Sequence, residues 1–478
     1  MPLHAKRASC LLATLLLLPH ATTEAQSPRD ARLAAVDRIF GRFDRRDSPG
    51  CALGVLQDGR FLVLRGYGSA HLDFQAPITP RTVFYLASVS KQFTAASVIL
   101  LAGDGKLSLD DDIRKHFPEL PDYGHRVTVR QMIHHTSGLR DYLTLMPMAG
   151  LRGENVNSDD DILQLIVRQR ELNFPAGSEY LYSNTGYYLL SELVRRVSGQ
   201  SLREFAHARI FAPLRMPSTH FHDDRLMIVP QRASAYSPAG EGFRLDMWAN
   251  FDKVGSGGLM SSIEDLAKWD RNFYTREVGG DFLHRQLHRQ GVLTNGDTLP
   301  YAGGLNVGSY RGLRTVRHGG STAGYRTELL RFPDHRFSVI ALCNASNATP
   351  ASYANRIAEL WLGDRMEPRA AEATDDAAAD AGDSSDERPE AGRLPDTELE
   401  LYLGDYESDE LGTMWNVALR ADTLVLRHPL GERVLRQVAT DRFRSGSMTV
   451  EFTREEGRVT EMRIGQGRVR MVRFRKSR

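Results

Sequence analysis

Residues 83–102 read VFYLASVSKQFTAASVILLA, and the change of character within this stretch decides the fold. Its first residues, Val83 to Leu86, are β-branched, aromatic or aliphatic and favour a strand. From Val89 the pattern is typical of a helix that continues to about Ala102. A strand is therefore expected to give way to a helix at this point, with Ser88 in the first helical turn.

Two polar side chains in this turn are suited to catalysis. Ser88 and Lys91 are three residues apart, so they share one face of the helix. The partial positive charge of the helix N-terminus favours an anion that develops beside the serine. A buried lysine can lose its proton near neutral pH and act as a base, whereas arginine cannot. Only seven of the 61 basic residues are lysines, so Lys91 is informative, although a Ser-x-x-Lys match also occurs by chance.

A second candidate element lies about ninety residues further on. Residues 174–184 read FPAGSEYLYSN, a Pro-Gly turn followed by Tyr182-Ser183-Asn184. The phenol can relay protons, and the amide can hold a substrate carbonyl or the lysine. Tyr353-Ala354-Asn355 has the same spacing but lacks the turn and falls in a closing helix, so we interpret it as structural.

A third element, His318-Gly319-Gly320-Ser321, follows the strand-like run Leu313 to Arg317. The glycines would let a substrate lie against the strand edge, with the backbone N–H of Ser321 available to an oxyanion. His134 and His135 are interpreted as structural residues that pack a turn. No spacing such as His-Glu-x-x-His indicates a metal, so neither a metal site nor a cofactor is expected.

The three motifs, in this order, resemble those of the penicillin-recognising serine hydrolases. The most similar branch contains class C β-lactamases, D-alanyl-D-alanine carboxypeptidases, D-aminopeptidases and related esterases. Flanking stretches also resemble family signatures: HTSGL at 135–139, FAPLRM at 211–216 and GSGGL at 255–259. The likeness covers about residues 30 to 364.

The resemblance implies a role for each candidate residue. Ser88 would be the acylated nucleophile, Lys91 the base that activates it, and Tyr182 the proton shuttle to the leaving group and the hydrolytic water. The backbone N–H groups of Ser88 and Ser321 would form the oxyanion hole. The residues implied to bind substrate are Asn184, His318, Gly319 and Gly320.

The third motif departs from many β-lactamases, which have Lys-Thr-Gly where this chain has His318-Gly319-Gly320. Histidine is only partly charged near neutral pH, so a fixed cation for a substrate carboxylate is missing from this motif. Neutral esters and amides are therefore expected to be better substrates than penicillins or cephalosporins. Peptidase and esterase relatives do use histidine at this position.

The expected fold class is α+β, of the β-lactamase/transpeptidase-like type. One antiparallel sheet is made from strands at both ends of the domain, flanked by helices and with a helical insertion between them. The expected strands are 51–56, 60–65, 325–332 and 337–343. The expected helices are 30–44, 89–102, 127–135, 159–170, 186–198, 262–274 and 350–362. If the first and last strands pair, Cys51 and Cys343 approach each other, and a disulfide is one outcome.

Four segments are expected along the 478 residues. A charged start, the apolar run Ala8 to Leu18 and a polar end predict a cleavable signal peptide at 1–25, and hence a periplasmic or secreted protein without a stable membrane anchor. The serine hydrolase domain spans 26–365. An acidic disordered linker follows at 366–394, and strands spaced about ten residues apart predict a small lipocalin-like β-barrel at 395–478.

The amino-acid composition and net charge exclude some classes of protein and of binding partner. With 41% hydrophobic and 25% charged residues the chain is neither disordered throughout nor a multi-span membrane protein. A formal net charge of +1 supplies no field to gather phosphates, so nucleic acid is not an expected partner. The arginine-rich end, Arg463 to Arg478, is interpreted as a solvated strand face, and few contacts are expected between the barrel and the hydrolase domain. The oligomeric state is left open.

The expected function is a secreted serine hydrolase that cleaves a small ester, amide or peptide through a Ser88 acyl-enzyme, with D-amino-acid peptides among the candidates. The alternatives are a β-lactamase, or a protein that binds penicillin or peptidoglycan fragments with little turnover. The set of Ser88, Lys91 and Tyr182 favours the enzyme, because a pure binder needs no deacylating base. A third hypothesis gives the function to the barrel, which would then hold an apolar ligand in an internal cavity.

Overall fold

The computed structural model describes residues 28–368 and 396–477. The expected signal peptide at 1–25 and the part of the expected linker from 369 to 394 lie outside the described residues. Within the two described ranges, no helix is long and apolar enough to cross a membrane.

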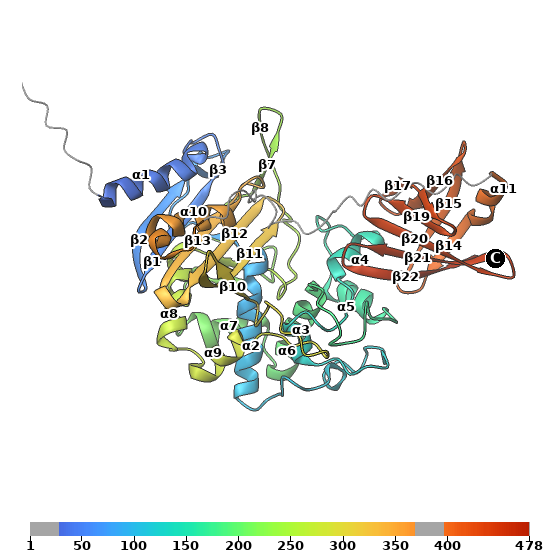
Figure 1. Ribbon diagram of the computed structural model, residues 1–478, viewed down its shortest axis with the longest axis horizontal. Helices are drawn as coiled ribbons and strands as arrows, with labels where there is room; N and C mark the ends of the chain where they lie inside the picture. The colour runs from blue at the N-terminus through green and yellow to red at the C-terminus, as the bar shows by residue number, and fades with distance from the viewer. Residues whose placement is uncertain (1–27, 369–395, 478) are drawn as a thin grey trace, which may run out of the picture.

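The two ends of the hydrolase domain meet in one six-stranded antiparallel sheet (Figure 1). The strand order is β10-β11-β12-β13-β1-β2, so the first strand pairs with the last. The strands are β1 (Cys51–Gln57), β2 (Arg60–Tyr67), β10 (Asn306–Tyr310), β11 (Leu313–Thr322), β12 (Tyr325–Phe332) and β13 (Phe337–Cys343). The predicted α+β fold class, with a sheet made from both ends of the domain, is confirmed.

The expected hairpin forms between β1 and β2. Asp58 and Gly59 both adopt positive φ, at 52° and 72°, as a two-residue turn of this hand requires. Gly59 accepts this backbone without cost, because it has no Cβ. The turn sets the register of β1 against β2, and the other edge of β1 pairs with β13, where Cys51 lies opposite Cys343.

Helices cover both faces of the sheet. The helices α1 (Pro28–Phe40) and α10 (Pro350–Leu362) pack on one face, and α8 (Ile263–Thr275) packs against β1 and β13 on the other. The insertion is built around α2 (Lys91–Gly103), which is buried over nearly its whole length and contacts α6, α7 and α9. The other helices are α3 (Val129–Ile133), α4 (Tyr142–Met148), α5 (Asp159–Val167), α6 (Asn184–Ser198), α7 (Leu202–Ala206) and α9 (Gly280–His288).

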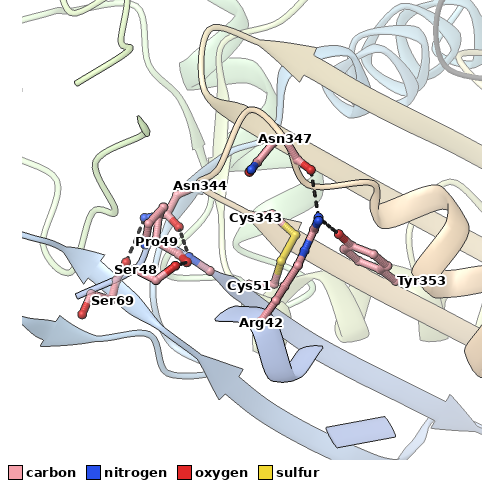
Figure 2. The surroundings of a disulfide bond; sticks show 10 residues. Arg42, Ser48, Pro49, Cys51, Ser69, Cys343, Asn344, Asn347 and Tyr353 are labelled. Atoms are coloured by element: carbon pink, nitrogen blue, oxygen red, sulfur yellow. Dashed lines mark hydrogen bonds between the residues drawn. A yellow bond between two sulfur atoms is a disulfide. The ribbon is translucent and has the colours of Figure 1, made fainter. Parts of the chain in front are cut away.

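A disulfide joins Cys51 to Cys343, with the two Cα atoms 4.0 Å apart. Figure 2 shows it between β1 and β13, next to a second tie in which the Arg42 guanidinium donates to the carbonyl of Asn347 and to the hydroxyl of Tyr353. Tyr353 is buried, so the structural interpretation of its Tyr-x-Asn motif is confirmed. The disulfide joins the first strand of the sheet to β13, and Arg42 ties the turn after α1 to the start of α10.

The C-terminal part is a nine-stranded antiparallel sheet with the order β17-β16-β15-β14-β22-β21-β20-β19-β18. Its two outer strands, β17 and β18, follow each other in the chain with only Leu435 between them, so the sheet curls into the predicted barrel. The strands are β14 (Gly404–Ser408), β15 (Thr413–Arg420), β16 (Thr423–His428), β17 (Gly431–Val434), β18 (Arg436–Ala439), β19 (Arg442–Ser445), β20 (Met448–Glu455), β21 (Arg458–Gln466) and β22 (Val469–Lys476). Packed rings, including Tyr402, Phe443 and Phe452, fill the interior, which weighs against the hypothesis of an internal apolar ligand.

The disulfide gives a prediction about stability. The crosslink closes 292 residues of chain, so replacing both cysteines (Cys51→Ala with Cys343→Ala) should lower the free energy of unfolding by about 2–4 kcal/mol. Guanidinium unfolding of the wild type, the reduced wild type and the double variant measures this change. Reductant should shift the midpoint of the wild type and leave that of the double variant in place; a wild type insensitive to reductant would contradict the crosslink.

Candidate active site

The turn before α2 carries Ser88. A 3-10 turn, Ala87–Ser90, runs directly into the helix, and Ala87 has φ 48°, a left-handed conformation that alanine rarely adopts. Ser90 holds the turn: its buried hydroxyl donates to the carbonyl of Ala87 at 2.6 Å and accepts from the N–H of Leu259 at 3.1 Å. Ser88 remains partly exposed. Of the two serines in the motif, only Ser88 is presented outward.

Lys91 is the first residue of α2 and is completely buried. Its Nζ lies 2.9 Å from Oδ1 of Asn184, 2.6 Å from the carbonyl oxygen of Ser256 and 3.3 Å from Oγ of Ser88. Burial, partly offset by the charge of Asp141, holds the pKa of Lys91 well below its ordinary value. In the neutral form that this shift favours, the amine would donate its two N–H groups to the two carbonyl oxygens and turn its lone pair to the Ser88 hydroxyl. This is the arrangement of a base beside a nucleophile.

Asn184 is the first residue of α6, and a hydrogen bond from its backbone N–H holds it in place. Its N–H donates to the Asp141 carboxylate at 2.6 Å, and the same carboxylate accepts from the N–H of Thr144 at the start of α4. Asp141 is buried. The Asn184 amide was expected to hold either a substrate carbonyl or the lysine. In this structure its Oδ1 accepts a hydrogen bond from Lys91, so it holds the lysine.

Tyr182 lies across the site from Lys91, with the Lys91 Nζ 4.7 Å from its ring centroid. Its hydroxyl is buried and makes no hydrogen bond with any described residue, and Ser88 is close enough to affect its pKa, which burial raises. The ring packs on His135 at 4.2 Å between centroids, and Nδ1 of His135 accepts from the N–H of Ser183. The structural interpretation of His135 therefore holds, and what it supports is the Tyr182 turn.

The third motif lies on β11, which passes directly beside the nucleophile turn. A Cβ on Gly320 would lie 2.3 Å from the carbonyl oxygen of Leu86, so only glycine allows this approach. The hydroxyl of Thr327 on β12 donates to the same carbonyl at 2.9 Å. Ser321 is the next residue of β11. That its backbone N–H binds the oxyanion formed when Ser88 attacks a carbonyl group stays a prediction. The motif brings the strand edge to the site as expected.

His318 corrects one expectation. The ring is buried, and burial together with the charge of Lys91 lowers the pKa of His318 to about 4, so the prediction that it is partly charged near neutral pH is wrong. Its Nδ1 donates to the carbonyl of Gly319 at 2.6 Å, and its Nε2 accepts from the hydroxyl of Tyr301 at 3.1 Å. The neutral ring has no nitrogen left for a substrate. In this structure the His318 ring makes hydrogen bonds only within the protein, to Gly319 of its own strand and to Tyr301.

A pocket lies beside the end of β11, where Thr322 and the following Ala323 are part of its lining. It encloses about 380 Å³, including space open to solvent. Its walls are largely aromatic and apolar, and its lining includes Tyr85, Met247, Trp248, Phe251, Met260 and Tyr325. Arg232 and His222 also line it. Such walls suit an apolar group.

The barrel makes close contact with the hydrolase domain, contrary to the expectation of few contacts. The Arg140 guanidinium, 1% exposed, donates to the Glu410 carboxylate at 2.7 Å and to the carbonyls of Arg470 and Met471 at 3.2 Å. Nε1 of Trp415 donates to the carbonyl of Met148. Figure 1 shows the barrel against α4 and α5. Folding both parts together satisfies polar groups that either part alone would leave unpaired.

One barrel residue enters the site itself. Arg468, in the turn between β21 and β22, places its guanidinium carbon 4.7 Å from the ring centroid of Tyr182. Its charge is among the factors that lower the pKa of Lys91. The interpretation of the arginine-rich end as a solvated strand face does not describe this residue fully: Arg468 is exposed, but it lies in a turn and its guanidinium faces the site.

Sequence reasoning missed four contributors to the site: Asp141, Ser256, Tyr301 and Arg468. Ser256 lies inside the quoted GSGGL stretch, so a signal existed for its backbone. Asp141 follows the HTSGL signature by two residues. Tyr301 and Arg468 have no local signal, because only the packing of distant segments brings them to the other residues.

The fold and its known relatives define an enzyme of the penicillin-recognising serine hydrolase class. The Beta-lactamase family model matches residues 36–360, and the chain belongs to this family. The resemblance inferred from the three motifs is confirmed.

Relatives of known sequence carry the name D-aminopeptidase. One from Gluconobacter oxydans (strain 621H) is 28% identical over 446 residues, covering 92% of this chain and 79% of the relative. One from Brucella anthropi is 30% identical over 297 residues, which is 62% of this chain and 56% of the relative. The chain thus spans just over half the length of the Brucella relatives.

Solved structures share the fold. The octameric penicillin-binding protein homologue from Pyrococcus abyssi has a TM-score of 0.61 at 23% identity, covering 94% of this chain and 99% of that one. The D-amino acid amidase from Ochrobactrum anthropi SV3, complexed with L-phenylalanine amide, has a TM-score of 0.58 at 21% identity and covers 70% of this chain and all of its own. At these identities the likeness concerns the fold.

The buried imidazole of His318 predicts acid sensitivity of the fold. Its pKa is about 4 in the folded protein and about 6.5 in an unfolded chain, so the unfolded chain binds a proton first. The stabilisation is complete above pH 6.5 and is lost as pH falls toward 4. His318→Gln should remove up to about 1.4 kcal/mol per pH unit from the slope of unfolding free energy in this window.

Urea unfolding at pH 7, 6 and 5 measures that slope. The comparison uses the slope of each protein against pH, which is independent of any difference in absolute stability between the variant and the wild type. Replacement of the exposed His125 by Gln is the matched control. An unchanged slope in His318→Gln would show that this imidazole is not held neutral.

Proposed function

We propose that the protein hydrolyses small amides and esters, including those of D-amino acids, through an acyl-enzyme on Ser88. The observation that carries the proposal is the contact of a buried amine, Lys91, with a partly exposed serine hydroxyl at 3.3 Å. The amide and D-amino-acid preference is drawn from relatives named D-aminopeptidase and D-amino acid amidase.

Acylation begins when the Ser88 hydroxyl gives its proton to the lone pair of Lys91 and Oγ attacks the substrate carbonyl carbon. The negative charge that develops on the carbonyl oxygen is held by the N–H groups of Ser88 and Ser321. Lys91 passes the proton to the Tyr182 oxygen as the Tyr182 hydroxyl protonates the leaving nitrogen or oxygen. The bond to the leaving group then breaks, and an ester to Ser88 remains.

Deacylation reverses these roles. A water molecule attacks the ester carbonyl and gives a proton to the base formed by Tyr182 and Lys91. Collapse of the second tetrahedral intermediate returns a proton to Ser88 Oγ and releases the acid. The raised pKa of Tyr182 favours its neutral phenol and the lowered pKa of Lys91 favours its neutral amine, so each can pass a proton on.

We further propose that the enzyme acts outside the cytoplasm, in the periplasm or after secretion. The charged, apolar and polar regions of residues 1–25 support export. The buried Cys51–Cys343 disulfide supports it independently, since such bonds persist in oxidising compartments.

Covalent labelling tests the assignment of nucleophile and base. Ser88→Ala should abolish both hydrolysis of a nitrophenyl ester and labelling by a fluorophosphonate. Lys91→Arg keeps a cation but cannot deprotonate, so its labelling rate should fall by about 10²–10⁴-fold. Intact-mass spectrometry and initial rates measure both effects.

Ser97→Ala, in the same helix with its hydroxyl bonded to the carbonyl of Phe93, is the matched control and should label normally. A label that persists in Ser88→Ala, on Ser90 or Ser183, would overturn the assignment of the nucleophile. Normal labelling of Lys91→Arg would overturn that of the base.

A further inference from the structure

The barrel presents one cation at the mouth of the candidate site. Arg468 follows Gly467 at the tip of the β21–β22 hairpin, its side chain is exposed, and its guanidinium lies over the Tyr182 ring. Flat stacking on an aromatic ring fixes the plane of a guanidinium while leaving its N–H groups free to donate. Arg468 is therefore part of the candidate active site, although the hairpin that carries it is part of the barrel.

The hairpin tip is held in place through its backbone. Asn173 bonds on both sides of Val469: its Nδ2 donates to the carbonyl of Arg468 at 3.0 Å, and its Oδ1 accepts from the N–H of Arg470 at 2.8 Å. Val469 is 1% exposed. The buried pair of Arg140 and Glu410 fixes the same hairpin further along. Arg468 therefore stays at the site when substrate is absent.

No described carboxylate neutralises this cation. Within the described ranges no acidic oxygen lies within 4 Å of Arg468, whereas its neighbour Arg470 pairs with Glu179 at 3.0 Å. Asp141 acts on the site but is buried, and its oxygens accept from backbone N–H groups. A guanidinium kept free in such surroundings is suited to a ligand carboxylate, which matches its planar N–H groups.

The position of Arg468 also tells which half of a substrate it meets. A leaving group must lie next to the hydroxyl that protonates it, and Arg468 lies on the Tyr182 ring. The apolar pocket is lined by Thr322 and Ala323 at the end of β11, and its lining includes neither Tyr182 nor Arg468. The leaving half of the substrate therefore faces the cation.

We propose that Arg468 binds a carboxylate on the leaving group, so that the preferred substrates are acyl peptides that lose a C-terminal amino acid with a free carboxylate. This inference rests on the proposed function, because it assumes hydrolysis through Ser88. It assigns to the barrel a specificity-determining residue of the active site. The cation that the third motif lacks is supplied by a segment 150 residues further along the chain.

Two thioesters that differ by one charge test the proposal in the full-length enzyme. N-benzoyl-D-alanyl thioglycolate releases a thiol with a carboxylate, and its methyl ester releases the neutral counterpart. The readout is the ratio of kcat/KM for the acid to kcat/KM for the methyl ester, followed by thiol release. Comparing this ratio between variants cancels the intrinsic reactivity of the two leaving groups.

Arg468→Met should lower the ratio by about tenfold or more, since a charged hydrogen-bonded pair is lost. Arg468→Glu should lower it further, because the sign of the charge is reversed. Arg470→Met is the matched control: it removes a neighbouring arginine of the same hairpin, which is already paired with Glu179, and should leave the ratio unchanged.

Failure of this inference can be told apart from failure of the proposed function. If both thioesters are hydrolysed through Ser88 and the ratio is the same in wild type, Arg468→Met and Arg468→Glu, the assignment of Arg468 is wrong. If wild type hydrolyses neither thioester faster than Ser88→Ala does, the proposed function is wrong.

Discussion

The site depends on one desolvated amine. A charged ammonium fully enclosed by protein loses its hydration, and among residues 28–368 and 396–477 no carboxylate contacts Lys91 to compensate. The neutral form is the one its surroundings satisfy, with Asn184 and Ser256 accepting its two N–H groups. The lone pair then faces Ser88. Burial thus does two things at once: it lowers the pKa of the lysine, which favours its neutral, basic form, and it determines which hydroxyl that base serves.

The rest of the fold serves to keep this arrangement rigid. The left-handed Ala87 turn presents Ser88, and β11 can lie against that turn only because Gly320 has no side chain to collide with it. The sheet that carries β11 is closed by strands from the two ends of the domain and joined covalently between Cys51 and Cys343. Strain at a nucleophile turn persists only where its surroundings fix it, and here sheet, helix and disulfide do so together.

Local sequence was sufficient for the parts of the molecule that local physics determines. The Asp-Gly hairpin, the long amphipathic helices and the order of the three motifs all carry short-range signals, and the structure has them where they were predicted. Tyr301 and Arg468 carry none, because their roles arise from contacts between segments far apart in the chain. The pKa of His318 could not be foreseen for the same reason: it depends on burial, which only the packed domain defines. Short strands such as β17 were not predicted from the sequence, because their residues are mostly exposed and show no alternation of apolar and polar side chains.

If Lys91 is the base and is neutral at working pH, the rate of acylation should not depend on pH above the lowered pKa of Lys91. The second-order rate of labelling by a neutral fluorophosphonate follows the fraction of Lys91 that is unprotonated. Because burial lowers the pKa of Lys91, this rate should level off well below pH 10.5, the ordinary pKa of lysine. A rate that continues to rise through pH 10.5 would mean that the amine is charged at neutral pH and that Lys91 is not a neutral base.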